Sequence, residues 1–518
     1  MPEYLSPGVY IEEVNSGPRP IEAVGTAMAA FVGFAPSGPI NKPVLVTNWT
    51  QYVENFGSID ESGRRSPHMP GAFLSHAVYG YFLNGGSRCY VTRVPTGGKD
   101  DKPAATQIPT KASKAIPSLT VTPRGTPERD IQVEIAPAAA GAGGEAAPEG
   151  TFTVKIKSGD TEETFENVTF AKKGGKNVVE TINQGSKLVT VAEAQSTGSV
   201  ADRAPEVGNY LIKTAPTTAI QVKSNTLIGD VSERSGIEGM EIAEDVTMVC
   251  CPDLMSAYIA GAIDRDGVKA VQLAMIAHCE RMADRMAILD PIPDLTPQQV
   301  KVWREKETNY DSKFAALYYP WILINGPDGK PLAVPPCGHI AGIYARSDNE
   351  RGVHKAPANE VIRGALNPVT EITKGEQDTL NPNGVNCIRT FTGRGIRVWG
   401  ARTLSSDPAW RYINVRRLFN YVEKSIERGT QWVVFEPNDP DLWARVRRDV
   451  GAFLTGVWRD GMLFGRTPDE AFYVKCDEEL NPADVRDRGQ LIIEVGMAPV
   501  KPAEFVIFRF SQYSGGGQ

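Results

Sequence analysis

The residues best suited to chemistry in this 518-residue chain are Cys337, His339 and His354. A thiol beside an imidazole is a minimal nucleophilic pair, because the imidazole can remove the thiol proton. The same residue types also bind zinc. They lie in residues 335–360, where glycine, proline and charged residues are too frequent for one regular element, so an irregular loop is predicted. A loop held by hydrogen bonds is the interpretation we favour, and a Cys-His enzyme site stays as the alternative.

Other sequence patterns that could indicate a site fit structural roles better. The run 326–330 is a turn and not a phosphate-binding loop, and the glycines of 393–400 have the wrong spacing for a dinucleotide loop and lead into a strand. Asp264 fits a helix cap better than a calcium ligand. The seven cysteines follow no disulfide or zinc spacing, so buried free thiols are expected: Cys89, Cys250, Cys251, Cys279, Cys337, Cys387 and Cys476. We therefore predict no catalytic residue, no cofactor and no metal.

Composition excludes several classes of protein. The net charge of −7 argues against a direct nucleic-acid binder, and 41% hydrophobic with 23% charged residues is ordinary globular composition. No run of about 18 apolar residues occurs, so no membrane insertion is expected. The first residues are acidic and interrupted by proline, unlike a secretory signal, which predicts assembly in the cytoplasm.

The strands and helices expected from the sequence predict a multi-domain protein of mixed α/β class. Residues 21–95 and 237–380 alternate strands with helices, which indicates one discontinuous middle domain whose largely parallel sheet is covered by helices. Residues 96–236 contain short strands and polar turns, typical of an inserted β-rich domain. Residues 381–502 form a C-terminal domain with two strong helices, at 408–427 and 439–460. A strand is predicted at 432–435, and a final series at 471–476, 491–495 and 505–510.

Both ends of the chain are predicted to be extended arms, 1–20 and 503–518. The run 503–510, AEFVIFRF, alternates along a strand with largely apolar side chains on both faces. Such a strand needs a partner edge, which suggests subunits that exchange strands. The residues assigned to the exchange are Tyr4, Val9, Tyr10, Ile11, Val14, Phe505, Val506, Ile507, Phe508 and Phe510.

Positive charge is concentrated in residues 389–466. Thirteen Arg and one Lys against eight Asp or Glu give 14 − 8 = +6, so the remainder sums to −13 within a total of −7. This segment is either a solvated helix face or a basic surface that meets an acidic partner. The candidate partner-facing residues are Arg445, Arg447 and Arg448.

Long motifs at both ends of the chain resemble the contractile tail sheath protein family. They are residues 4–14 (YLSPGVYIEEV), 31–39 (FVGFAPSGP), 381–386 (NPNGVN), 395–403 (GIRVWGART), 412–417 (YINVRR), 436–438 (EPN) and 442–443 (LW). The resemblance covers about 1–95 and 240–511. The insert falls where this family tolerates variable outer domains.

This resemblance implies a structural protein and not an enzyme. Sheath subunits stack as rings, typically six-fold, around an inner tube, and their contraction drives the tube through a target envelope. The implied partners are further copies of the chain, the tube protein, and baseplate and terminal cap proteins, assembled in a bacterial cytoplasm. In the family, the two arms add strands to neighbouring C-terminal domains. A phage tail and a bacterial injection system both remain open, as does a receptor-binding protein that displays residues 96–236.

Overall fold

The computed structural model divides into two compact units. One, which we call the sheet unit, comprises residues 27–349 and 357–411; the other, the C-terminal unit, comprises 1–26, 350–356 and 412–518. The structure describes residues 21–59, 65–96, 105–111, 116–123, 130–138, 150–159, 161–171, 176–194, 199–212 and 220–509.

An eight-stranded sheet forms the core of the sheet unit. Its order is β2 (Val44–Val46), β5 (Cys89–Arg93), β1 (Ala29–Gly33), β14 (Met248–Cys250), β15 (Met286–Leu289), β16 (Ala315–Tyr319), β20 (Val385–Phe391) and β21 (Gly395–Trp399). The strands from β5 to β20 are parallel, and β2 and β21 are antiparallel edges. Continuous apolar strands such as the fully buried β1 are typical of a parallel sheet covered on both faces. The predicted mixed α/β class is confirmed.

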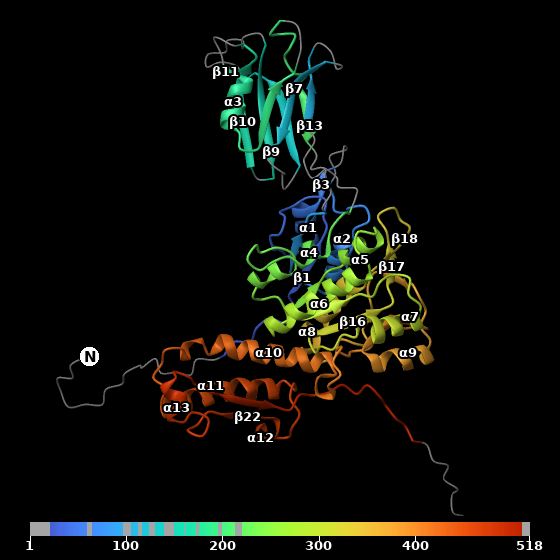
Figure 1. Ribbon diagram of the computed structural model, residues 1–518, viewed down its shortest axis with the longest axis vertical. Coiled ribbons are helices and arrows are strands. Elements are labelled where there is room, and N and C mark those ends of the chain that lie inside the picture. Colours follow the sequence, from blue (N-terminus) through green and yellow to red (C-terminus); the bar gives the residue numbers. More distant parts are fainter. Residues whose placement is uncertain are drawn as a thin grey trace, which may run out of the picture. The chain divides into compact units, whose positions relative to one another are not determined.

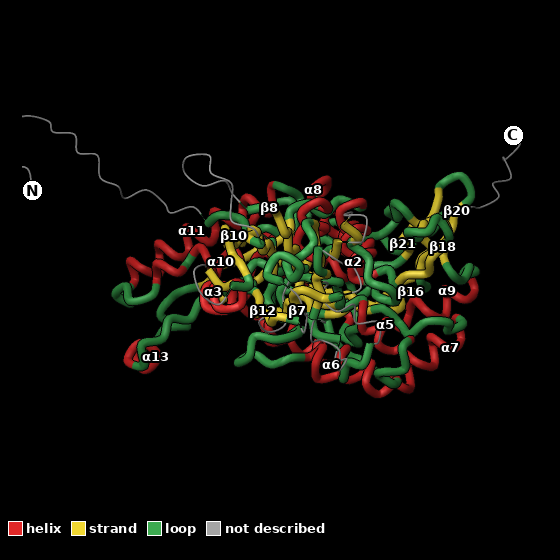
Figure 2. The backbone as a smooth tube through the Cα atoms, turned by 90° about the horizontal axis from the view of Figure 1, so that it is seen from above, coloured by secondary structure: helices red, strands yellow, loops and turns green. Residues whose placement is uncertain are grey.

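Helices cover the two faces of this sheet. They are α1 (Trp49–Phe56), α2 (Leu74–Leu83), α4 (Ser224–Ile228), α5 (Asp253–Ile259), α6 (Arg265–Met282), α7 (Pro297–Val302), α8 (Cys337–Arg351) and α9 (Lys374–Leu380). The crossovers β1–α2–β5 and β14–α6–β15 advance in opposite directions, so the right-handed rule puts α2 and α6 on opposite faces. In Figure 2, α6 and α8 lie on opposite sides of the strands. Asp264 caps α6, as predicted, by accepting the Gly267 N–H at 2.8 Å.

Close backbone contact joins α2 to α8. A methyl group at Gly338 would overlap the carbonyl oxygen of Ala77, and one at Gly342 would lie 2.5 Å from the carbonyl oxygen of Tyr81. Only a residue without a Cβ allows this approach, so the two glycines fix the separation of the helices.

Two buried carboxylates link strand ends to helix starts. Asp253 accepts the N–H groups of Phe34 at 2.6 Å and Leu74 at 3.2 Å, tying the end of β1 to α2. Asp290 accepts the Cys337 N–H at 3.0 Å, tying the end of β15 to α8. Burial raises the pKa of Asp253 to about 6 and that of Asp290 to about 7, despite the hydrogen bonds that favour ionisation.

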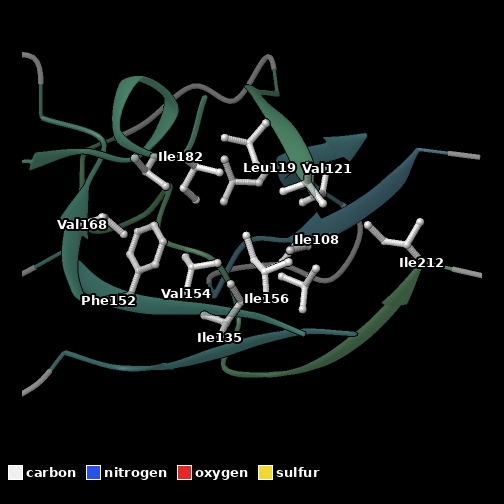
Figure 3. Packing of buried hydrophobic residues seen from close by; sticks show 14 of the residues in the cluster. Ile108, Leu119, Val121, Ile135, Phe152, Val154, Ile156, Val168, Ile182 and Ile212 are labelled. Carbon is white, nitrogen blue, oxygen red and sulfur yellow. The ribbon is translucent and has the colours of Figure 1, made fainter. Parts of the chain in front are cut away.

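The segment between β5 and β14 contains two further sheets with their own apolar core. One has the order β11 (Lys176–Asn177), β10 (Thr161–Thr169), β9 (Thr151–Ser158), β8 (Ile131–Pro137) and β13 (Gly208–Ile212); the other β12 (Val189–Glu193), β7 (Pro117–Pro123) and β6 (Thr106–Pro109). Helix α3 (Val178–Gly185) adds Ile182 to this core. Figure 3 shows Ile135, Val154 and Ile156 of one sheet with Leu119 of the other.

The two ends of this inserted segment meet. The Gln221 N–H donates to the Thr96 carbonyl oxygen at 2.8 Å. The chain therefore leaves and re-enters the sheet unit at one place, which we call the stem.

In the C-terminal unit, α10 (Ile413–Gly429) and α11 (Pro440–Arg459) run side by side (Figure 1). Leu418 and Val422 of α10 share a buried cluster with Val446, Val450 and Leu454 of α11. The unit also contains α12 (Pro468–Ala471), β22 (Phe472–Lys475), α13 (Ala483–Asp487) and β23 (Glu494–Met497).

The sheet unit contains two smaller sheets beside its eight-stranded one. A two-stranded sheet pairs β3 (Ser58–Ile59) with β4 (Arg65–Ser66). A three-stranded sheet has the order β18 (Pro331–Val334), β17 (Ile322–Asn325) and β19 (Ala365–Pro368).

Three sequence predictions are corrected by the structure. The boundary expected at residue 381 lies near 412, because β20 and β21 complete the eight-stranded sheet. The loop expected after Pro335 is largely the helix α8, whose glycines serve contact with α2. The strand expected at 432–435 is a 3-10 turn, Gln431–Val433, followed by Phe435 at a positive φ of 69°.

Candidate assembly surfaces

Cys337 and His339 are buried packing groups of α8. Cys337 is the first residue of the helix, and burial holds its pKa well above the usual range, so the thiol stays protonated. The His339 ring packs against Gly80 of α2. Burial, with His76 nearby, lowers the pKa of His339 to about 4, which makes it a weak base. A buried neutral thiol and a weak buried base do not form an activated nucleophile.

His354 belongs to the C-terminal unit and not to the sheet unit. Its carbonyl oxygen accepts from Asn414 Nδ2 at 2.7 Å. The three residues of the enzyme alternative are therefore not brought together by any described contact.

The described residues bring together no set of side chains that could bind a metal ion. No group of three His, Cys, Asp or Glu side chains in the described ranges could hold a metal ion. All seven cysteines are buried free thiols, as predicted. Among the helices of the described part of the chain, none has the length and apolar character needed to cross a membrane.

The C-terminal arm leaves the C-terminal unit from a fixed anchor. Asn414 Nδ2 donates to the Val500 carbonyl oxygen at 3.2 Å, and the Tyr412 hydroxyl donates to Glu504 Oε2 at 2.9 Å. Sequence reasoning missed this anchor. A contact across some ninety residues leaves no local pattern in the sequence. The one sequence feature that coincides with the anchor is the 412–417 motif, which contains Tyr412 and Asn414.

Beyond this anchor, the predicted strand exposes apolar side chains. Phe505, Val506, Ile507 and Phe508 are 70%, 70%, 78% and 76% exposed. Residues 501–509 form no helix or strand in the single chain, so the expected third strand beside β22 and β23 is absent from the described residues. Phe510 and the N-terminal residues Tyr4, Val9, Tyr10, Ile11 and Val14 lie outside the described residues.

Strands β22 and β23 form a sheet of only two strands. They pair antiparallel from Phe472 with Met497 to Lys475 with Glu494. One face packs on α11 through residues such as Val474 and Val495. Two-stranded sheets are marginal alone, and their outer edges can accept further strands.

The predicted basic residues of α11 have different surroundings. Arg445 is exposed, lies 5.4 Å over the Trp432 ring and pairs with Glu436 at 3.3 Å. Arg448 is half exposed and bonds Asp449 at 2.9 Å. Arg447 instead donates to the Cys476 carbonyl oxygen, which fixes α11 to the end of β22. Arg445 and Arg448 therefore lie at the surface, each paired with a carboxylate, whereas Arg447 has an internal bond.

Two adjoining family models match residues 236–512 of the chain. Residues 236–404 match the phage tail sheath protein central domain, and residues 405–512 match the phage tail sheath C-terminal domain. Together they cover more than half of the 518 residues.

Curated relatives and solved structures are similar to this chain over different lengths. The tail sheath protein of Vibrio phage KVP40 is 30% identical over 34% of this chain and 26% of its own length. That of Burkholderia phage BcepMu is 23% identical over 96% of this chain and 94% of its own. The matched part of the chain spans between 26% and 61% of the lengths of the first three curated relatives.

The fold is similar to that of a sheath subunit in an assembled particle. The structure of the anti-feeding prophage helical sheath in its contracted state aligns with a TM-score of 0.57 and 25% identity. The alignment covers 99% of this chain and 100% of that chain.

Proposed function

This chain belongs to the phage tail sheath family, and from that premise we propose that it is a structural subunit of a contractile sheath. Copies stack as six-fold rings in a helical array around an inner tube, and contraction drives the tube through a target envelope. The particle is a phage tail or a phage-tail-like injection system, assembled in a bacterial cytoplasm. Its other partners are the tube protein, the baseplate and a terminal cap.

The observation that carries this proposal is the pairing of a donor with an acceptor in one unit. The donor is the exposed apolar run Phe505–Phe508, held at its start by Tyr412. The acceptor is the two-stranded sheet of β22 and β23. A chain that presents both can extend its sheet with the arm of a neighbour, and the N-terminal arm supplies a second strand in the same way.

Each added strand contributes several main-chain hydrogen bonds, each worth about 0.5–1.5 kcal/mol net. Repeated through a lattice, these bonds hold subunits together while the domain bodies rotate. The arms are connectors, and residues 97–219 are peripheral to this connection.

Truncation tests the proposal directly. Chains that lack residues 503–518, or residues 1–16, should remain folded monomers and form no sheath tubes in electron micrographs. The full chain, expressed in parallel, should form tubes. Normal contractile tubes from either truncation would defeat the strand-exchange proposal.

We further propose that Arg445 and Arg448 face the inner tube, with Arg447 holding α11 in place. Changing both to Glu should weaken polymerisation on purified tubes, because like charges would replace attraction to an acidic tube. Arg459→Glu is the matched control for each single variant, Arg445→Glu or Arg448→Glu, since it makes the same charge change at an exposed position near the end of the same helix. Tube templating equal to that of the control would remove this role.

A further inference from the structure

Three arginines meet on one face of the hairpin formed by β20 and β21. Arg389 and Arg397 lie directly opposite each other in the antiparallel register, and Arg394 lies in the turn between the strands. Phe391 and Trp399 share that face, with ring centroids 4.5 Å apart. We call these five residues the arginine–aromatic face.

The guanidinium groups of Arg389 and Arg394 stack on the rings of this face. That of Arg389 lies 5.3 Å from the Phe391 centroid, and that of Arg394 lies 5.7 Å from Phe391 and 5.9 Å from Trp399. Stacking on a ring orients the cation without neutralising it.

Among the described residues, the side chains of these arginines donate hydrogen bonds to neutral acceptors. Arg389 donates to the Ile372 carbonyl and the Gln377 amide oxygen, at 3.0 and 2.9 Å. Arg394 and Arg397 both donate to Asn359, and Arg397 also donates to the carbonyl oxygen of Arg394. These are bonds that set side-chain direction and leave the positive charge in place.

No carboxylate in the described part of the chain lies within ion-pair distance of the three guanidinium groups. Glu371 accepts instead from Thr390, which alternation places on the other face of β20, and Glu360 lies 3.6 Å from Arg346. Like charges directly opposite across two strands are destabilising. The isolated chain therefore keeps an arrangement that an acidic partner would relieve.

The charge of the chain itself indicates which partner fits. Residues outside 389–466 sum to −13, so in that part of a second copy acidic side chains outnumber basic ones. A nucleic acid carries a much higher density of negative charge than a second copy, so it would meet the stronger repulsion from the rest of the chain. The edge strand β21 is already bonded to residues 359–362, so the contact is made by side chains and not by strand addition.

We propose that the arginine–aromatic face docks against an acidic surface of a second copy of this chain. The contact is heterologous, joining different surfaces of two copies, as an open helical array requires. This inference rests on the proposed sheath function, since it assumes self-association, and it adds a contact independent of the arms. Charge pairs of this kind steer association and set its dependence on salt.

Arg394→Glu in the full chain tests the proposal, because Arg394 is exposed and, within the described residues, its side chain contacts Asn359 and the two rings. The critical concentration for tube formation, measured by sedimentation, should rise about ten-fold at low salt. Arg394→Lys should restore most of the assembly, and Arg459→Glu should stay near the wild-type value. Added salt should raise the critical concentration of the wild type more than that of Arg394→Glu.

Several outcomes separate the hypotheses. A monomer that melts at the wild-type temperature shows that Arg394→Glu still folds. Equal critical concentrations for the wild type and Arg394→Glu overturn the docking contact and leave the sheath function standing. A wild-type chain that forms no tubes under any condition overturns the sheath function itself. Binding of duplex DNA that Arg394→Glu abolishes, with assembly unchanged, assigns the face to nucleic acid and overturns the proposal.

Discussion

Gly338 and Gly342 set the approach of α8 to α2, and this contact can be tested one methyl group at a time. Gly338→Ala or Gly342→Ala should destabilise the sheet unit by about 1–3 kcal/mol, because backbone atoms must move to admit the Cβ. Gly375→Ala is the control: it lies in α9 with open space around it and should be neutral or slightly stabilising. Denaturant unfolding monitored by circular dichroism gives the comparison, and equal loss at all three positions would contradict the contact.

Asp290 should make stability depend on pH. Burial raises its pKa to about 7, so the folded state holds this proton above the pH at which the unfolded chain releases it. The stabilisation is complete below the unfolded pKa of about 4 and is lost as pH rises to about 7. Asp290→Asn should flatten the fall in melting temperature across this range while keeping the bond to the Cys337 N–H. Exposed Asp378→Asn should leave the wild-type pH profile, and an unflattened profile for Asp290→Asn would show that Asp290 is ionised when buried.

Local signals at the residue scale were predictable, and long-range ones were not. The caps Asn48, Asp264 and Asp439 each accept an N–H three residues on, so the sequence alone indicates them. Cys337 is buried, and its N–H donates to a carboxylate 47 residues away, a contact that leaves no local pattern in the sequence. Its spacing to His339 therefore suggested chemistry that the packing does not support.

At the scale of elements, the C-terminal arm can be tested without removing it. Successive N–H groups of a strand point to opposite sides, so proline at 506 and proline at 507 remove donors on different sides. If the arm pairs along one edge, one of Val506→Pro and Ile507→Pro should block tube formation and the other should be milder. Both monomers should melt at the wild-type temperature, because residues 501–509 form no strand in the single chain. Normal tubes from both variants, seen by electron microscopy, would argue against an added strand.

Element type followed the sequence wherever periodicity was strong. The helices α10 and α11 and the parallel strands of the sheet unit have apolar patterns that specify them locally. The helix α8 was missed because its glycines, which normally weaken a helix, are required by contact with α2. The strand at 505–510 has the right pattern, but a strand forms only beside a partner edge.

At the scale of the whole molecule, the stem permits removal of the inserted segment. Thr96 and Gln221 are joined by a backbone hydrogen bond, so a short Gly-Ser linker can replace residues 97–219. The shortened chain should keep the melting temperature of its remaining units and should form tubes that contract, because the insert has its own core. Electron microscopy before and after triggering decides this. Loss of assembly would show that the insert is part of the lattice and not peripheral.

The domain boundary predicted at residue 381 was wrong because strands that are distant in the sequence share one sheet. Strand β20 pairs with β16, some 68 residues earlier, and β21 follows it as a hairpin. A change of composition along the chain does not reveal which strands share a sheet. The two-part division became visible only through the register of the pairs.

The exposed arm also has a consequence for the timing of assembly. Phe505, Val506 and Ile507 are exposed in the single chain. Under the proposed strand exchange a neighbour covers them, so each monomer both adds to a growing polymer and accepts the next copy. Growth of such a polymer is expected to show a lag that shortens steeply with concentration and disappears when preformed seeds are added. Timing would then depend on when a seed becomes available and not on when the subunit is made.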